Sequence, residues 1–467
     1  MASRASRLRP PAAALGAGAI LAASLAGSLA FWPGLMIWDS ARQYAQAVSG
    51  AFDDWHPPVM EAIWRLLLPL SQGPWPMLVL QLALWTAGFA LIIAWAVRRA
   101  TGGRAIAIIA CTLLPLSMAL MGEVIKDSLM TAALVLATGL WLGAEGRAAG
   151  RRIAAAALIL FAASVRYNAF LAGLPMLVAL APVAWRDRPI RLVSLAAAAL
   201  VALMSVMPLA NALLGARKSG VELSLVIFDL GGIGYHSGAD AFPPLGLRDP
   251  VGANRACYTP RRWDSYAEWS DAQCPIHFDT VRAAFARRRL SPRWWEMQAI
   301  LAHPAAWAEH RLVHWNLETA FLVRRQPFDP VVPPKSDPND ADSQIADTPA
   351  TRWLVRAAEL SALTPLGWPC CWLALGFGLT LVAPALPSRD RILPLSLSGL
   401  LYGLGYAVFG VATDERYYFW TMVATCVAAA IAVTDCVDWR TVGRARLAVA
   451  GAPLLAITLA AIAWRLV

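Results

Sequence analysis

The chain has 467 residues, of which 58% are hydrophobic and 15% charged, and its formal net charge is +10. Soluble domains usually carry about 25% charged residues, so this composition excludes a disordered tail protein, a small disulfide-stapled domain and a simple two-domain cytosolic enzyme. A mean hydropathy of +0.53 predicts a membrane protein instead.

Apolar stretches predict eleven membrane spans, because a spanning helix needs about 20 mostly apolar residues. In chain order these spans cover residues 11–38, 76–97, 105–122, 128–144, 153–166, 169–185, 192–214, 366–386, 393–412, 417–436 and 447–466. Three arginines precede the first span, as in a signal peptide. The uncharged stretch from Pro10 to Trp38 is nevertheless longer than the roughly 7–15 apolar residues of such a peptide, so we expect a retained anchor and an all-α polytopic fold.

The distribution of basic residues predicts the orientation of the chain. With a cytoplasmic N-terminus, seventeen arginines fall in the inner segments, among them Arg4, Arg7, Arg9, Arg147 and Arg440, and the short outer segments hold five basic residues. This bias follows the positive-inside rule, so we expect the outer turns to face the periplasm of a bacterial inner membrane. The same distribution excludes nucleic acid as a partner, because the basic excess forms no continuous face.

One long polar insertion, residues 216–365, separates an N-terminal bundle (1–215), which contains the first outer loop (39–58), from the C-terminal spans (366–467). Within the insertion, Ser291 followed by Pro292 predicts a capped helix start, and a second helix is expected from Pro304 to about Val323. The Pro- and Asp-rich stretch 326–349 predicts an irregular loop, and the glycines within 231–234 predict a turn.

The cysteines fall into two groups. Cys257 and Cys274 are the pair in the outer insertion, where the compartment permits disulfides, so we expect them to form one. The other five lie in or beside spans and are expected to be small buried hydrophobes: Cys111, Cys370, Cys371, Cys426 and Cys436.

Four outer turns place ionisable side chains at one membrane face, where such costly groups are functional candidates. They hold Asp39, Arg42, Tyr44, Asp53, Asp54 and His56; then Glu123, Lys126 and Asp127; then Arg166, Tyr167 and Asn168; and last Asp414, Glu415, Arg416 and Tyr417. A carboxylate can act as general base toward a hydroxyl, and Lys and Arg can hold a phosphate whose charge grows as it leaves. The pattern predicts group transfer from a phosphate-linked donor.

The first outer loop resembles that of GT-C glycosyltransferases. Asp39 follows the first span directly, a segment with Gln43 and Tyr44 comes next, and His56-Pro57-Pro58 enters the second apolar segment. The resemblance is to the protein-mannosyltransferase-like and aminoarabinose-transferase-like branch and extends loosely to the many-spanning layout, the Lys126-Asp127 turn and the Arg166-x-Asn168 turn. It implies a GT-C-like helical bundle with an outer, mostly helical domain.

The resemblance also implies an activity and roles for the residues. It implies transfer of a sugar, with inversion, from a polyprenyl-phosphate donor to a hydroxyl of an envelope glycan, lipid or protein. The roles that follow are Asp39, or its competitors Asp53 and Asp54, as general base; Lys126, Arg166 and Arg416 as donor-phosphate ligands; and Tyr44, His56, Asn168 and Tyr417 as substrate contacts. Members of this branch differ in their need for a divalent cation, so a requirement for Mg²⁺ or Mn²⁺ stays open.

Structural explanations compete with each of these roles. Asp39 also suits a helix N-cap, Lys126 an ion pair with Asp127 or Glu123, and Arg166 a snorkelling helix end. Arg416 has acidic neighbours that suit a local salt bridge. At the level of the whole chain, the alternative is a transporter or flippase of a lipid-linked or anionic envelope precursor, which would favour sites at mid-membrane in repeated halves. The sequence contains no internal repeat.

Overall fold

The computed structural model describes residues 10–99, 102–144, 148–269, 274–325, 327–328, 330–435 and 442–467. Six residues named above lie outside the described part of the chain: Arg4, Arg7, Arg9, Arg147, Cys436 and Arg440. The described residues cluster into two units, a first unit within 1–218, 329–403 and 416–458 and a second unit within 219–328, 404–415 and 459–467.

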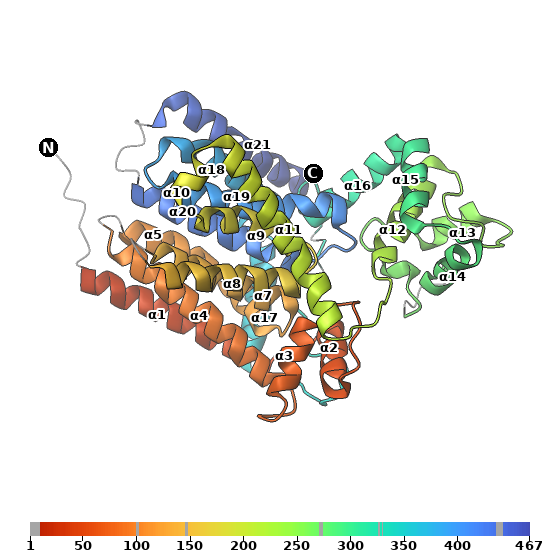
Figure 1. Ribbon diagram of the computed structural model, residues 1–467, viewed down its shortest axis with the longest axis horizontal. Helices are drawn as coiled ribbons and strands as arrows, with labels where there is room; N and C mark the ends of the chain where they lie inside the picture. Colours follow the sequence, from red (N-terminus) through yellow and green to blue (C-terminus); the bar gives the residue numbers. More distant parts are fainter. Residues whose placement is uncertain are drawn as a thin grey trace. The chain divides into compact units, whose positions relative to one another are not determined.

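The first unit is built from helices (Figure 1). They are α1 (Pro10–Leu29), α2 (Trp38–Ser49), α3 (Val59–Leu67), α4 (Trp75–Val97), α5 (Gly102–Ala110), α6 (Pro115–Gly122), α7 (Lys126–Leu142), α8 (Ala149–Val165), α9 (Ala169–Leu180), α10 (Val183–Arg186), α11 (Pro189–Leu213), α17 (Pro349–Ala362), α18 (Pro369–Val382), α19 (Arg389–Phe409), α20 (Phe419–Asp435) and α21 (Arg444–Leu466), the last residues of α19 and α21 belonging to the second unit. Over the described ranges, β-pairing is limited to isolated bridges. The all-α expectation therefore agrees with the structure.

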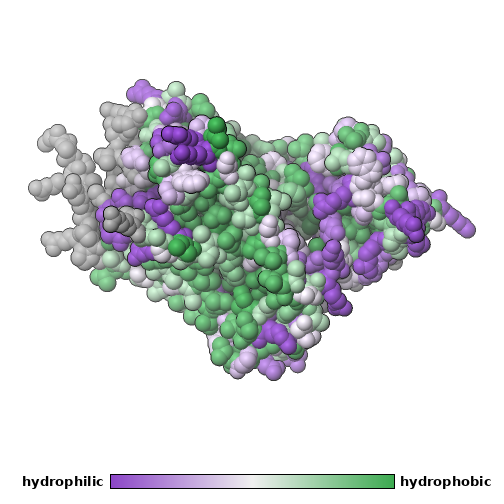
Figure 2. Space-filling model, in the orientation of Figure 1, coloured by the Kyte–Doolittle hydropathy of each residue, from purple (hydrophilic) through white to green (hydrophobic). Residues whose placement is uncertain are grey.

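Five helical segments are long and apolar enough to cross a membrane: Trp75–Val97, Pro189–Leu213, Arg389–Phe409, Glu415–Thr434 and Arg444–Leu466. Three shorter apolar helices accompany them, Ala14–Leu29, Ala169–Leu180 and Pro369–Ala385. On the face in Figure 2, apolar side chains form a broad band over the helices of the first unit. The total of eleven spans stays a prediction.

Several of the expected spans differ from the observed helices, and two of them show why. The first helix ends at Leu29, and α2 begins only at Trp38, so the uncharged stretch 11–38 is not one continuous helix. The stretch 105–122 is divided into α5, a 3₁₀ turn and α6, because Leu114 is extended before Pro115 and proline restricts the residue that precedes it. The hydropathy of the sequence does not reveal the breaks within residues 11–38 and 105–122.

Close packing between α4 and α7 positions the start of α7. A Cβ at Gly88 would lie 2.6 Å from the Leu136 nitrogen, and one at Gly139 would lie 2.7 Å from the Gly88 oxygen. Small residues of this kind allow two helix backbones to approach closely. Almost every residue of α7 is buried, so the first turn of α7, which carries Lys126 and Asp127, is held firmly.

The second unit contains α12 (Glu222–Ser237), α13 (Pro250–Cys257), α14 (Phe278–Arg288), α15 (Pro292–Ala302) and α16 (Pro304–Glu318). The Ser291 hydroxyl accepts a hydrogen bond from the Trp294 N–H, as its position before Pro292 predicts. The helix expected to reach Val323 ends at Glu318, shortly before Ala320 takes a left-handed backbone conformation. A disulfide joins Cys257 and Cys274.

The turn expected from the glycines within 231–234 is wrong, because these residues lie inside α12. A Cβ at Gly231 would lie 2.3 Å from the Tyr266 hydroxyl oxygen, and one at Gly232 would lie 2.1 Å from the His310 ring. The glycines therefore provide room for two large side chains against the helix. These glycines serve close packing, and a single sequence does not distinguish a packing glycine from a turn glycine.

A buried ionic network holds α12 to α16. Asp229 Oδ1 lies 2.5 Å from an Arg311 nitrogen and 3.3 Å from His310 Nε2, and its Oδ2 accepts from Trp307 Nε1 at 3.2 Å. Burial alone would raise the pKa of Asp229, but Arg311 and His310 outweigh it and lower the pKa. Burial lowers the pKa of His310 to about 4, so this ring is neutral near pH 7.

Asp229→Ala is expected to destabilise the protein by about 3–5 kcal/mol, because it leaves the buried Arg311 charge without its carboxylate. Asp279→Ala is the matched control, since Asp279 and Arg282 form an exposed pair at 2.5 Å that should be worth no more than about 1 kcal/mol. Thermal unfolding of both full-length variants in detergent measures the difference. Equal shifts for the two variants would contradict this view of the network.

Candidate functional site

The backbone brings the first outer loop to the second outer turn. The Leu35 N–H donates to the Gly122 carbonyl at 3.0 Å, and the Val124 N–H donates to the Leu35 carbonyl at 2.9 Å. Gln81 Nε2 adds hydrogen bonds to the Met121 and Glu123 carbonyls at 2.7 and 2.9 Å. The residues after α1 are thereby fixed beside the start of α7, although they lie far apart in the sequence.

A late loop of the first unit fixes the start of α2. The Met36 N–H donates to the Ser336 hydroxyl at 3.1 Å, and the Trp38 N–H donates to Asp337 Oδ2 at 2.9 Å. The Asp337 N–H in turn donates to the Met36 carbonyl at 2.8 Å. An acidic side chain at a helix N-terminus accepts an otherwise unpaired N–H and complements the helix dipole. Asp337 therefore helps to hold the turn of α2 that carries Asp39.

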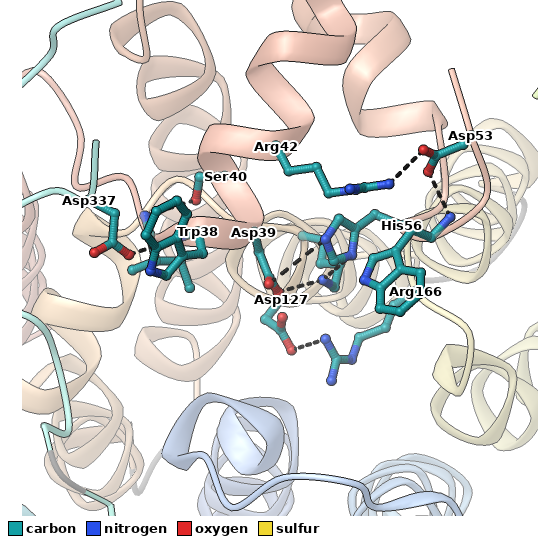
Figure 3. A network of polar contacts seen from close by, with 12 residues as sticks. Trp38, Asp39, Ser40, Arg42, Asp53, His56, Asp127, Arg166 and Asp337 are labelled. Atoms are coloured by element: carbon teal, nitrogen blue, oxygen red, sulfur yellow. Dashed lines mark hydrogen bonds and ion pairs between the residues drawn. The ribbon is translucent and has the colours of Figure 1, made fainter. Parts of the chain in front are cut away.

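Asp39 lies at the centre of a charge cluster (Figure 3). Its Oδ2 lies 2.8 Å from Lys126 Nζ and 3.3 Å from an Arg416 guanidinium nitrogen. The Asp39 side chain is 28% exposed, whereas Lys126 and Arg416 are buried. Side chains from the first, second and last outer turns thus meet at one carboxylate. Lys126 pairs here with Asp39, and the local partners that the sequence suggested, Asp127 and Glu123, are not needed to explain its position.

His56 completes this cluster from the first loop. Its Nδ1 lies 2.8 Å from Lys126 Nζ, and its Nε2 lies 3.8 Å from Asp39 Oδ1. Burial and the Lys126 charge together hold the pKa of His56 well below its usual range, so the ring is neutral. Because an ammonium group has only donors, Nδ1 accepts from Lys126 and the ring hydrogen lies on Nε2, on the side of Asp39.

A second ion pair lies beside the first. Arg166, which follows α8, places a guanidinium nitrogen 2.5 Å from Asp127 Oδ1, and both side chains are buried. The Arg166 guanidinium carbon lies 4.8 Å from the centre of the Tyr417 ring, and that of Arg416 lies 5.6 Å from the same ring. The ring of Tyr417 therefore joins the two arginines through cation–π contacts. The cluster contains all three of the expected phosphate ligands.

The other first-loop aspartates occupy a different place. Asp53 Oδ2 forms an ion pair with Arg42 at 2.6 Å, and Asp53 Oδ1 accepts from the Trp55 N–H at 3.0 Å. The Asp54 N–H donates to the Arg217 carbonyl, and the Asp54 carbonyl accepts from the Tyr167 hydroxyl. Of the three competing aspartates, the structure places Asp39 against the cations Lys126 and Arg416.

Three of the four expected substrate contacts are buried, and His56 among them belongs to the charge cluster. Tyr44 is 1% exposed and packs against Trp64, with ring centres 5.2 Å apart, so its position fits the packing between α2 and α3 better than contact with a substrate. Asn168 is buried at the start of α9. Tyr417 remains in the charge cluster, as described above.

Neighbouring cations determine the direction in which the pKa of Asp39 shifts. Burial alone would raise the pKa of Asp39, but the charges of Lys126 and Arg416 outweigh it and hold the pKa well below its usual range. A carboxylate held this strongly by cations is a poor proton acceptor until those charges are drawn elsewhere. An anionic ligand that binds Lys126 and Arg416 would draw their charges away from Asp39 and make it a better proton acceptor.

Sequence reasoning missed Glu61, a fully buried carboxyl group on α3. Burial, together with the charge of Asp53, raises the pKa of Glu61 to about 9, so it is protonated near pH 7. In the sequence Glu61 looks like an ordinary acidic residue in the first turn of a helix. Its burial depends on the packing of α3, which local sequence does not report.

The described residues hold no group of three or more His, Cys, Asp or Glu side chains that could bind a metal ion. His310 and His314, which share a helix face, bond to other partners. His310 lies beside Asp229, and His314 beside Glu318 and the Pro260 carbonyl. We assign no step to a divalent cation.

Comparisons with known proteins add little beyond this geometry. No protein-family model and no curated protein matches the chain. Solved structures similar to it include ArnT from Cupriavidus metallidurans bound to undecaprenyl phosphate and the same protein in the apo state. The first is 15% identical with a TM-score of 0.32, covering 94% of this chain and 79% of that chain. The second is 16% identical with a TM-score of 0.33, covering 91% and 77%. Because both TM-scores lie below 0.5, the functional argument rests on this chain's own residues.

We expect the parent protein to lose stability as pH rises, and Glu61→Gln to lessen that loss. The folded state keeps the Glu61 proton up to about pH 9, whereas an unfolded glutamate loses it near pH 4.3. Unfolding therefore releases a proton throughout this window, and the free energy of unfolding falls as pH rises. Melting temperatures between pH 5 and 9 should decline less steeply in Glu61→Gln.

Glu222→Gln serves as the control for this pH series, because Glu222 is an exposed residue in the first turn of α12. Its melting curve should follow that of the parent. A Glu61→Gln curve parallel to the parent curve would show that Glu61 is ionised in the folded protein.

Proposed function

We propose that the protein is an integral-membrane glycosyltransferase that moves a sugar from a polyprenyl-phosphate donor to a hydroxyl of an envelope acceptor at the outer face of the membrane. The observation that carries the proposal is the convergence of Lys126, Arg166 and Arg416 around Asp39 and Asp127 in the first unit. Buried charges are costly, and a pair of this kind is weak evidence for stability. A cluster of them beside helices apolar enough to span a membrane favours a binding or catalytic site.

Donor binding is assigned to the three cations. Arg166 and Arg416 can each present two N–H groups to phosphate oxygens, and Lys126 adds a point charge. The polyprenyl phosphate is the leaving group, so its negative charge grows as the bond to the sugar breaks. Cations fixed in advance by the packing of α7 and by the Tyr417 ring stabilise this growing charge at little cost in reorganisation.

Asp39 is assigned the role of general base. Lys126 and Arg416 hold its carboxylate. A donor phosphate at these cations competes for them, which raises the proton affinity of Asp39 when the donor is in place. Asp39 then accepts the proton of the acceptor hydroxyl as that oxygen attacks the anomeric carbon and the phosphate leaves. Donor binding and activation of the base are thus coupled through the same two cations.

A carrier of lipid-linked precursors is the competing function, and product analysis separates the two. Purified full-length protein is incubated with a radiolabelled polyprenyl-phosphate sugar and envelope extract. A transferase yields labelled acceptor and free polyprenyl phosphate. A carrier leaves the sugar–phosphate bond intact, which would overturn the proposal.

Asp39→Asn is expected to lower the transfer rate by roughly 10²–10⁴-fold, because an amide cannot accept the acceptor proton. It should bind undecaprenyl phosphate at least as tightly as the parent, since the carboxylate that competes for Lys126 and Arg416 is neutralised. Rates come from the radiolabel assay and affinities from titration of the purified protein in detergent.

Asp53→Asn is the matched control for this experiment. It changes a carboxylate of the same loop that pairs with Arg42 instead of the cluster, so both transfer and binding should stay close to parent values. Full activity in Asp39→Asn, or loss of activity in Asp53→Asn alone, would contradict the assignment of Asp39 as general base.

A further inference from the structure

Helix α15 in the second unit presents an apolar stripe to the outside. Trp294 is 63% exposed, Met297 47% and Leu301 71%, and none of the residues of α15 is buried. Positions i, i+3 and i+7 share one face of a helix, so these three side chains form a continuous row. Exposed large apolar side chains in a row mark an interaction surface more often than scattered ones do.

Trp295, the residue after Trp294, fixes the orientation of this stripe through its contacts. Trp295 Nε1 donates to the Ala241 carbonyl at 2.9 Å, and the Trp295 ring contacts Phe285 of α14 edge-on. Trp295 thus anchors α15 to the second unit, and Trp294 lies on a different side of the helix. The exposed stripe is therefore a consequence of how α15 is docked.

Arginines border the stripe. Arg287, Arg288, Arg289 and Arg293 are all exposed, the first three at the end of α14 and the last in the first turn of α15. Arg289 takes a left-handed conformation that ends α14, which brings the two helices into immediate succession. The same short segment, 287–301, therefore carries a basic cluster and an apolar row.

We propose that α15 is an interfacial helix that binds the surface of an anionic phospholipid bilayer. A row containing tryptophan beside clustered arginines suits the boundary between acyl chains and negatively charged headgroups. Each copy of this chain meets a bilayer, because it carries five helices apolar enough to cross one. A second copy of the chain is a poorer occupant, since its identical face would bring four arginines against four arginines. This inference does not depend on the transferase proposal.

Photo-crosslinking tests the inference in the full-length protein. Benzoylphenylalanine replaces Leu301 in one variant and Arg282, an exposed residue of α14 outside the stripe, in the control. Each variant is placed in nanodiscs that contain phosphatidylglycerol, and adducts are identified by mass spectrometry. We expect several-fold more lipid adduct at position 301 than at position 282.

A charge-reversed variant tests the role of the arginines. Changing Arg287, Arg288, Arg289 and Arg293 together to Glu should lower the lipid adduct at position 301 several-fold in phosphatidylglycerol nanodiscs. Added inorganic phosphate should leave the adduct unchanged in the parent, because the binding needs a surface and not a free anion. Equal adduct at 301 and 282, or crosslinks at 301 to a second copy of the chain, would overturn the proposal.

Discussion

The ion pair between Asp39 and Lys126, 2.8 Å long, is the interaction on which the candidate site depends. Its partners lie at the starts of α2 and α7, so it can form only if the residues after α1 are held beside the second outer turn. The hydrogen bonds of Leu35 to both sides of Glu123 provide that restraint, and the bond from Trp38 to Asp337 fixes the first turn of α2. His56 and Arg416 are then added from two further segments.

The cost of burying charge explains why Asp39 pairs with Lys126 and Arg416. Burying these cations without a counter-charge would be costly, and the Asp39 carboxylate supplies part of that charge. In the proposed cycle, the same pairing keeps Asp39 a weak base and limits proton transfer before the donor is bound. A single carboxylate would thus stabilise the buried cations and serve the reaction.

The sequence predicted much of the helical content because apolar stretches mark membrane-length helices independently of their neighbours. It also indicated the outer turns whose side chains meet, since the positive-inside rule places those turns on one side. It could not choose among Asp39, Asp53 and Asp54, because the choice depends on which carboxylate faces Lys126 and Arg416. The glycines of α12 were misjudged because they make room for Tyr266 and His310, which are distant in sequence. Glu61 was missed because its burial depends on the packing of α3.

Lys126, Arg166 and Arg416 are proposed to form a single phosphate site. A structure of the full-length protein with undecaprenyl phosphate tests it most directly. We expect phosphate oxygens within hydrogen-bond distance of Lys126 Nζ and the Arg166 guanidinium, with Asp39 moved away from Lys126. Phosphate bound elsewhere, with the Asp39–Lys126 pair still intact, would contradict it.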